Sequence, residues 1–155
     1  MTITHLLLDI EGTTCPVSFV SEVLFPYAKQ SLSSYLNDDQ EDLDLKNILL
    51  AAEREWDGDP SPDSIKLRQA TRNQNQNFID SIKVYFEYLI NVDRKSTALK
   101  DLQGKVWDNG YRKGEITSHL FNETSECLKR WHRRRRSLSV YSSGSIQAQK
   151  VLYRH

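Results

Sequence analysis

The hydrophobic residues of the chain follow two different spacings. Short apolar runs occupy residues 3–8 and 138–141, and each of them stops at polar residues, Asp9 in the first case and Ser142 in the second. A short apolar run closed by a turn signal is typical of a buried strand in a parallel sheet. We therefore predict two strands, one near each end of the sequence.

Between and after these runs the apolar residues recur three and four positions apart, which is the spacing of amphipathic helices. This spacing predicts helices over residues 17–36, 45–56, 63 onward, 97–111, 121–131 and 145 onward. Pro26 interrupts the first of them, so we expect a kink there, or a loop into a second helix near Tyr27. The clearest stripe predicts a long helix and consists of Phe78, Ile79, Ile82, Tyr85, Phe86 and Leu89.

The resulting order is strand, long helical stretch, helix, strand and start of a helix. Strands that are separated by helices indicate an α/β layer structure. In such sheets ligands bind beyond the carboxyl ends of the strands. The residues that follow the two predicted strands are therefore the first place to look for chemistry.

Composition excludes several classes of protein. The 155 residues carry a formal net charge of +0, so no overall field attracts nucleic acid or a membrane surface. No apolar run is long enough to span a bilayer, and the first residues lack the features of a secretory signal. Cys15 and Cys127 form neither a disulfide framework nor a metal-binding spacing. We expect a cytoplasmic protein.

The first strand is followed by Asp9-Ile10-Glu11-Gly12-Thr13-Thr14. Side chains alternate along an extended chain, so Asp9 and Glu11 are expected to point the same way. Two such acids can hold Mg²⁺, or one can attack phosphorus while the other moves protons. Gly12 would permit a sharp turn, which Thr13 could close. The same spacing is common in solvated turns, so the pair alone leaves both interpretations open.

The second strand is followed by Tyr141-Ser142-Ser143-Gly144-Ser145. Serine hydroxyls and free backbone N–H groups at a strand-to-helix turn can bind an anion. An ordinary serine cap of the following helix explains the same residues, and taken alone it is the simpler interpretation. The anion site gains weight when both strand ends are considered together.

Three long segments of the sequence resemble one known family. They are L-L-L-D-I-E-G-T-T-C-P-V-S-F-V-S-E-V-L-F-P-Y-A from Leu6, D-R-K-S-T-A-L-K-D-L-Q-G-K-V-W from Asp93 and V-Y-S-S-G-S-I-Q-A-Q-K from Val140. In this order they resemble the enolase-phosphatase (acireductone synthase) subfamily of haloacid-dehalogenase-type phosphatases. That subfamily has a glutamate, as at Glu11, where many haloacid-dehalogenase-type enzymes have a second aspartate.

The resemblance implies a fold, a reaction and residue roles. It implies a Rossmann-like parallel-sheet core from residues 1–18 and 105–155, with residues 19–104 inserted as an all-helical cap. Asp9 would be the nucleophile and a Mg²⁺ ligand, and Glu11 the acid/base, also at the metal. Ser142 and Ser143 would bind the substrate phosphate. The implied reaction of methionine salvage is enolisation and dephosphorylation of 2,3-diketo-5-methylthiopentyl-1-phosphate, with a small-molecule substrate as partner and a monomeric enzyme.

The sequence departs from the family pattern at two places. The family carries a lysine and a further metal-binding acid after the second strand, and these 155 residues offer no counterpart of either. We therefore expect a C-terminally truncated chain with an exposed sheet edge and little activity. The basic run from Arg133 to Arg136 also replaces a short Gly-containing turn, and a solvated loop explains it better than a nucleic-acid site. An inactive fragment or a non-catalytic binding module is the alternative function.

Overall fold

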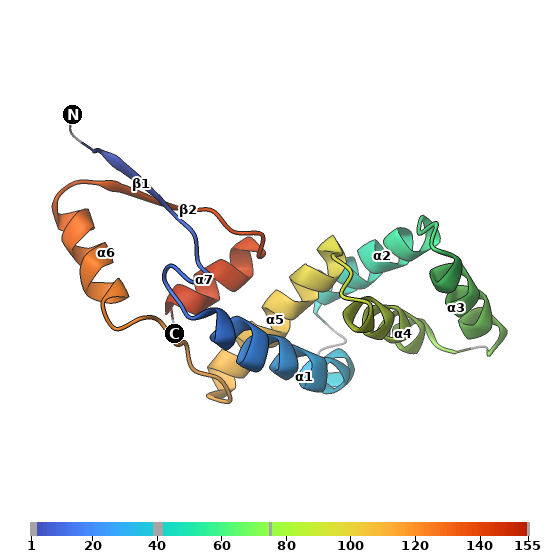
Figure 1. Ribbon diagram of the computed structural model, residues 1–155. Helices are drawn as coiled ribbons and strands as arrows, with labels where there is room; N and C mark the ends of the chain where they lie inside the picture. The colour runs from blue at the N-terminus through green and yellow to red at the C-terminus, as the bar shows by residue number, and fades with distance from the viewer. Residues whose placement is uncertain (1–2, 39–41, 75, 155) are drawn as a thin grey trace. The chain divides into compact units, whose positions relative to one another are not determined.

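A computed structural model describes residues 3–38, 42–74 and 76–154 and shows a largely helical chain with a small parallel sheet (Figure 1). The chain is therefore of the α/β class, as its patterning predicts. It divides into two compact units, one formed by Met1–Tyr27 with Trp107–His155 and the other by Ala28–Val106. The first unit contains the sheet and both strand ends with candidate chemistry.

The two strands are β1 (His5–Leu8) and β2 (Ser137–Val140), and they pair in parallel from His5 with Ser137 to Leu8 with Val140. One further hydrogen bond follows the last pair, from the Tyr141 N–H to the Leu8 carbonyl at 2.8 Å. Parallel pairing places both carboxyl ends at the same edge of the sheet. The parallel arrangement confirms the prediction from the sequence.

The expected burial of these strands is wrong. Leu7 is 69% exposed and Val140 is 38% exposed, and no residue of either strand is fully buried. The physical reason is that the sheet of the described residues has two strands, so each strand has an unpaired outer edge. The departure from the family pattern predicts an exposed edge of the sheet. The sheet of the described residues has such an edge.

The segment around Pro26 is helical on both sides, so the expected loop is absent there. A π-helical segment, η1 (Phe19–Leu24), passes directly into α1 (Phe25–Asp38). The N–H of Phe25 donates to the carbonyl of Val20, five residues back. Pro26 has no N–H to continue the hydrogen-bond ladder, and it stands where the π-helical segment passes into α1. Within the same unit, the Trp107 indole donates to the Leu24 carbonyl at 2.7 Å.

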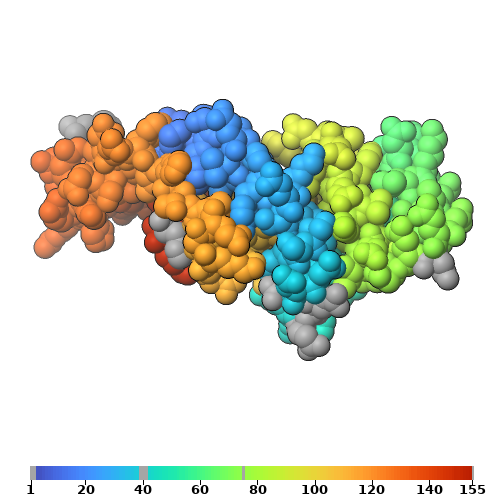
Figure 2. Space-filling model, turned by 90° about the horizontal axis from the view of Figure 1, so that it is seen from below, coloured from blue at the N-terminus to red at the C-terminus, as the bar shows by residue number. Residues whose placement is uncertain are grey.

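The helix expected over residues 121–131 begins three residues later, as α6 (Thr124–Arg133). The backbone N–H of Phe121 and the hydroxyl of Thr124 both donate to the carbonyl of Thr14, each at 3.0 Å. These bonds hold the first residues in a turn instead of a helix. Figure 2 shows the α6 segment and the turn after it, in orange, at the molecular surface, where residues 133–135 are exposed. Arg133, Arg134 and Arg135 thus have the solvated setting that we expected, whereas Arg136 is half-buried and donates to the Ile3 carbonyl.

The second unit contains α2 (Leu43–Asp57), α3 (Pro62–Asn73) and α4 (Phe78–Asn91), and most of α5 (Thr97–Lys113). The predicted stripe on α4 is buried at Ile82, Tyr85, Phe86 and Leu89. Phe78 at its start is 41% exposed, so its expected burial is wrong. Phe78 follows Asn77, whose side chain caps the helix at the Asp80 N–H, so it lies in the solvated first turn.

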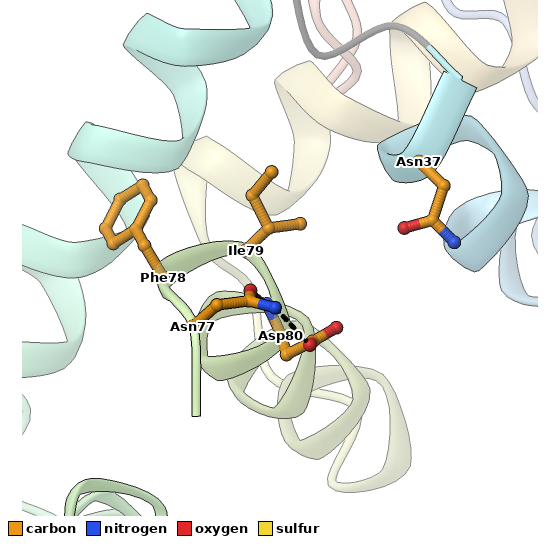
Figure 3. Close-up of a pocket in the computed structure, with 5 residues that line it drawn as sticks. All are labelled: Asn37, Asn77, Phe78, Ile79 and Asp80. Carbon is orange, nitrogen blue, oxygen red and sulfur yellow. Dashed lines mark hydrogen bonds between the residues drawn. The ribbon is translucent and has the colours of Figure 1, made fainter. Parts of the chain in front are cut away.

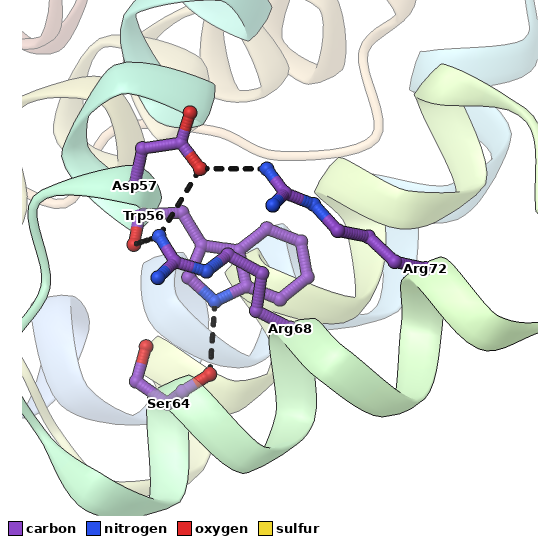
Figure 4. Close-up of polar contacts among 5 residues, drawn as sticks. All are labelled: Trp56, Asp57, Ser64, Arg68 and Arg72. Atoms are coloured by element: carbon purple, nitrogen blue, oxygen red, sulfur yellow. Dashed lines mark hydrogen bonds and ion pairs between the residues drawn. The ribbon is translucent and has the colours of Figure 1, made fainter.

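Polar contacts tie α2 to α3 in this unit. The Trp56 indole donates to the Ser64 carbonyl at 3.3 Å, and Arg68 donates to the Trp56 carbonyl at 2.8 Å. Asp57 accepts from both Arg68 and Arg72, as Figure 4 shows. The Trp56 ring also stacks on the Tyr85 ring with centroids 5.0 Å apart, which links α2 to α4. These contacts join three helices through one aromatic side chain.

Candidate functional site

The first candidate residue, Asp9, follows the last paired residue of β1 and is exposed. Its Oδ1 accepts a hydrogen bond from the backbone N–H of Ile10 at 2.8 Å. The other carboxylate oxygen is available to a ligand or to an electrophile. The short β1 strand ends here because the polar Asp9 leaves the sheet while Ile10 turns into the core.

The loop after Asp9 is a tight turn around one carbonyl. The oxygen of Ile10 accepts from the N–H groups of Thr13, Thr14 and Cys15, at 3.2, 2.9 and 3.1 Å. Gly12 has φ +74°, a left-handed conformation that glycine adopts without strain. The turn that the sequence predicts at Gly12 is therefore present, and Thr13 closes it through its backbone.

Glu11 is exposed and forms an isolated parallel bridge with Cys15. The bonds of this bridge are Cys15 N–H to the Ile10 carbonyl and Gly12 N–H to the Cys15 carbonyl. They come from the neighbours of Glu11, so the carbonyl of Glu11 itself takes no part in the bridge. Glu11 thus offers two oxygen functions, its carboxylate and its backbone carbonyl.

The second strand end carries Ser142 and Ser143. The hydroxyl of Ser142 is half-buried and accepts from the Gly144 N–H at 3.1 Å, while Ser143 is exposed. Ser145 caps α7 (Ile146–Arg154), because its hydroxyl accepts from the Ala148 N–H at 3.2 Å. The capping interpretation therefore applies to Ser145, and the two preceding serines lie in the turn before the cap.

The sheet register brings the two candidate segments to one edge. Leu8 pairs with Val140, and the Tyr141 N–H continues the ladder to the Leu8 carbonyl. Asp9 and Ser142 are thus one and two residues beyond the same pair of strand ends (Figure 1). This is the place where α/β sheets bind ligands.

The two acids influence a buried thiol behind them. Burial raises the pKa of Cys15, and the negative charges of Glu11 and Asp9 raise it further. Burial likewise raises the pKa of the Tyr153 phenol, although its hydrogen bond with Thr14 lowers it in part. The loop therefore sets exposed carboxylates over an interior that is uncharged at neutral pH.

The oxygen atoms of Asp9 and Glu11 supply part of the ligand set that a hard cation such as Mg²⁺ needs. Asp9 and Glu11 supply carboxylate oxygens, the ligand type that Mg²⁺ prefers, and Mg²⁺ keeps several waters in most protein sites. Among the described residues, no group of three or more His, Cys, Asp or Glu side chains comes together. A metal at this edge would therefore rely on these two residues and on water.

Thr14 and Tyr153 take part in this site, although the sequence predicts no role for either of them. Thr14 is buried, and its hydroxyl lies 2.7 Å from the phenol oxygen of Tyr153 on α7. Thr13 closes the turn through its backbone N–H, as expected, but the hydroxyl bonds belong to Thr14. Adjacent threonines after a glycine carry no signal that distinguishes the buried one from the exposed one.

Two cavities of the described residues bear on the candidate chemistry. One of about 220 Å³ lies behind the first strand end and is lined by Leu8, Thr13 and Thr14 together with residues of α6 such as Cys127 and Trp131. The other, of about 460 Å³, belongs to the second unit and is lined by Asn37, Asn77, Phe78, Ile79 and Asp80 (Figure 3). None of the four candidate residues lines either cavity.

Among the described helices, none has the length and apolar character to cross a membrane.

No protein-family model matches the chain. It is 93% identical over all 155 residues to enolase-phosphatase E1 of Parasynechococcus marenigrum, and 52% identical over 151 residues to enolase-phosphatase E1 of a Synechococcus strain. It spans 63% and 61% of the lengths of these relatives. A crystal structure of UTR4 protein from Saccharomyces cerevisiae matches with a TM-score of 0.63 and 32% identity, covering 98% of this chain and 56% of that one. Over its whole length, the sequence of the chain is similar to part of the enolase-phosphatases.

Proposed function

We propose that this chain carries the nucleophile and the phosphate-binding turn of a Mg²⁺-dependent enolase-phosphatase of methionine salvage. The single observation that supports this most is the parallel register, which brings the Asp9 loop and the Ser142 turn to one edge of the sheet. The substrate that we propose is 2,3-diketo-5-methylthiopentyl-1-phosphate, and the product is the acireductone. Residues 19–104 would form the inserted helical cap of this family.

Dephosphorylation would proceed in two steps. In the first, a carboxylate oxygen of Asp9 attacks phosphorus, the bond between phosphorus and the substrate oxygen breaks, and Glu11 gives its proton to the leaving oxygen. In the second, water attacks the phosphorus of the aspartyl-phosphate and gives a proton to Glu11. The P–O bond to Asp9 then breaks, which releases phosphate and restores both residues.

Enolisation precedes these steps and needs a base near the carbon that carries the phosphate group. Glu11, as a carboxylate, takes the proton from this carbon, the electron pair of the C–H bond forms the C=C bond, and solvent water gives a proton to the neighbouring carbonyl oxygen, which becomes the enol hydroxyl. Glu11 is then protonated, as the first step of dephosphorylation requires, and the proton that it later takes from the attacking water is released to solvent before the next cycle. We assign the proton transfer to Glu11, because its carboxylate is exposed at the same edge as Asp9. One acid/base residue thus serves both halves of the reaction.

The phosphate would be held by the turn after β2. The hydroxyls of Ser142 and Ser143 supply donors that neutralise charge on the phosphate oxygens. Mg²⁺ would be bound by the Asp9 carboxylate and by the Glu11 carbonyl, and it offsets the repulsion between carboxylate and phosphate dianion. The chain has no described residue in the role of the family's lysine or of its last metal-binding acid, so we expect slow turnover.

The experiment measures phosphate release from the diketo-phosphate with and without Mg²⁺. Two lost electrostatic contacts of about 2.7–4 kcal/mol each would slow the reaction on the order of ten-thousand-fold or more. The purified chain alone should therefore be nearly inactive. Fusion of a family-type C-terminal segment after Tyr153, which supplies the lysine and the last metal-binding acid, should restore Mg²⁺-dependent release.

The matched control is Asp9→Asn in the fused protein, which removes the nucleophile but keeps the shape of the side chain. Release that persists in Asp9→Asn would contradict the proposal, and so would release that ignores Mg²⁺. Fast turnover by the 155-residue chain alone would mean that another residue, or a second subunit, supplies the missing charge.

A further inference from the structure

The candidate nucleophile lies on a loop whose shape depends on one buried residue, Thr14. Only 3% of Thr14 is exposed, although it lies five positions after the solvent-facing Asp9. A buried threonine hydroxyl needs hydrogen-bond partners, since an unsatisfied one is costly. The partners of Thr14 come from three separate segments of the same unit.

The first segment is the loop itself. The Thr14 hydroxyl lies 3.2 Å from the Ile10 carbonyl, which already accepts three backbone N–H groups. The orientation of the Ile10 carbonyl sets the peptide plane between Ile10 and Glu11. On the other side of the same residue, the Ile10 N–H donates to the Asp9 Oδ1 at 2.8 Å. Four donors on one oxygen hold that orientation, and Thr14 supplies two of them, its N–H and its hydroxyl.

The second segment is α7. The Tyr153 phenol and the Thr14 hydroxyl are 2.7 Å apart, and either oxygen can be the donor. The Thr14 proton is used on the Ile10 carbonyl, which is an acceptor only, so Tyr153 donates to Thr14 and Thr14 donates to Ile10. Such a chain of hydrogen bonds polarises each member and orders the whole array.

The third segment precedes and opens α6. The carbonyl of Thr14 accepts from the Phe121 N–H and from the Thr124 hydroxyl, each at 3.0 Å. Thr124 is itself buried. Thr14 therefore joins the loop to α6 through its carbonyl and to α7 through its hydroxyl, and both helices belong to the sheet-containing unit (Figure 1).

We propose that Thr14, supported by the Tyr153 phenol, is a positioning residue that orients the Asp9 carboxylate and the Glu11 peptide for phosphoryl transfer. The proposal rests on the function proposed above. Thr14 acts through the Ile10 carbonyl and touches no substrate atom. Loss of its hydroxyl should loosen the loop and leave the sheet and the helices in place.

The test uses beryllofluoride with Mg²⁺, because beryllium accepts a lone pair from an aspartate oxygen and imitates the aspartyl-phosphate. Binding to the 155-residue chain is followed by fluorine NMR at increasing beryllofluoride, at saturating Mg²⁺. Wild type should give a bound signal that Asp9→Asn abolishes. Thr14→Val should weaken binding about tenfold, as expected for loss of one buried hydrogen bond.

Three further variants separate positioning from packing. Thr14→Ser keeps the hydroxyl and should bind within about threefold of wild type, while Tyr153→Phe keeps the ring and should lie between wild type and Thr14→Val. Thr13→Val changes the exposed neighbour and should bind as wild type does. Circular dichroism of each variant confirms that the helices are retained.

The outcomes distinguish the two proposals. A wild-type signal that depends on Asp9 but is unchanged in Thr14→Val overturns the positioning role and leaves the proposed function standing. Equal weakening by Thr14→Val and Thr14→Ser also overturns it, because packing would then be the cause. A wild type that gives no Asp9-dependent signal, either alone or in the fused protein, overturns the proposed function, and the positioning role with it.

Discussion

At the scale of single residues, Asp59 is a buried carboxylate that is paired with one cation, Arg94. Its side chain is fully buried, and its Oδ1 lies 2.7 Å from the Arg94 guanidinium and 2.9 Å from the Ser61 N–H. Burial alone would raise the pKa of the Asp59 carboxyl, but the hydrogen bond from Arg94 and weaker polar partners hold that pKa below its usual range. The pair therefore stabilises the fold while Asp59 is ionised.

The first prediction concerns this pair. A folded pKa below the unfolded value gives stability that is present above about pH 4 and is lost as the pH falls through the folded pKa. Arg94→Met leaves a buried carboxylate without its cation, and we expect the free energy of unfolding to fall by about 3 kcal/mol at pH 7. Because protonation then removes the buried charge, the deficit should shrink on acidification to pH 4, as measured by urea unfolding at each pH.

The matched control is Arg72→Met, which breaks the exposed pair with Asp57 in the same unit (Figure 4). Exposed pairs contribute up to about 1 kcal/mol, so this variant should stay close to wild type. Similar losses in both variants, or a deficit of Arg94→Met that does not change with pH, would contradict the role of burial.

Arg135 is a second residue to test, because its backbone conformation should lower the stability of the fold by a measurable amount. Its φ is +55°, in the left-handed region that glycine adopts freely, and it lies in the turn from α6 to β2. Arg135→Gly should raise the free energy of unfolding by about 0.5–1 kcal/mol, because relief of backbone strain exceeds the added entropy of the unfolded chain. Arg134→Gly is the control: φ is −83° there, so the change should be neutral or destabilising in thermal unfolding. A larger gain in stability from Arg134→Gly than from Arg135→Gly would contradict the inference that the backbone of Arg135 is strained.

At the scale of elements, α4 offers two phenylalanines in contrasting environments. Phe86 is completely buried and Phe78 is 41% exposed on the same helix. Phe86→Ala should lower the free energy of unfolding by roughly 3–5 kcal/mol, because transfer and cavity costs add. Phe78→Ala should cost well under half as much in the same chemical-denaturation measurement. A loss below about 1 kcal/mol for Phe86→Ala would mean that the stripe does not form the core of this unit.

At the scale of the whole molecule, Mg²⁺ should stabilise the chain through the edge that carries Asp9 and Glu11. With free Mg²⁺ at ten times its dissociation constant, linkage predicts about 1.4 kcal/mol of added stability. Thermal unfolding of wild type should therefore shift upward with Mg²⁺ at constant ionic strength. Asp9→Asn should show no such shift, and equal responses of the two proteins would exclude a metal site at Asp9.

Much of the local structure is predictable from the sequence, because it depends on neighbours along the chain. The spacing on α4, the short apolar runs of the strands and the glycine turn after Asp9 all appear where the pattern indicates. Both segments with candidate chemistry also stand at strand ends, as predicted. The spacing of apolar residues indicates which face of a helix or strand is apolar, and polar residues indicate where the helix or strand ends.

Only the tertiary structure decides which apolar residues are covered and which polar ones are partnered. The strands are partly exposed because the sheet has two unpaired edges, and Phe78 is exposed because the cap at Asn77 opens α4 in solvent. The helix expected from residue 121 starts late because the Thr14 carbonyl binds Phe121 and Thr124. The contact of Thr14 with Tyr153 joins residues 139 positions apart. Such a contact depends on how the loop and α7 pack together, and no pattern of neighbours along the chain encodes that packing.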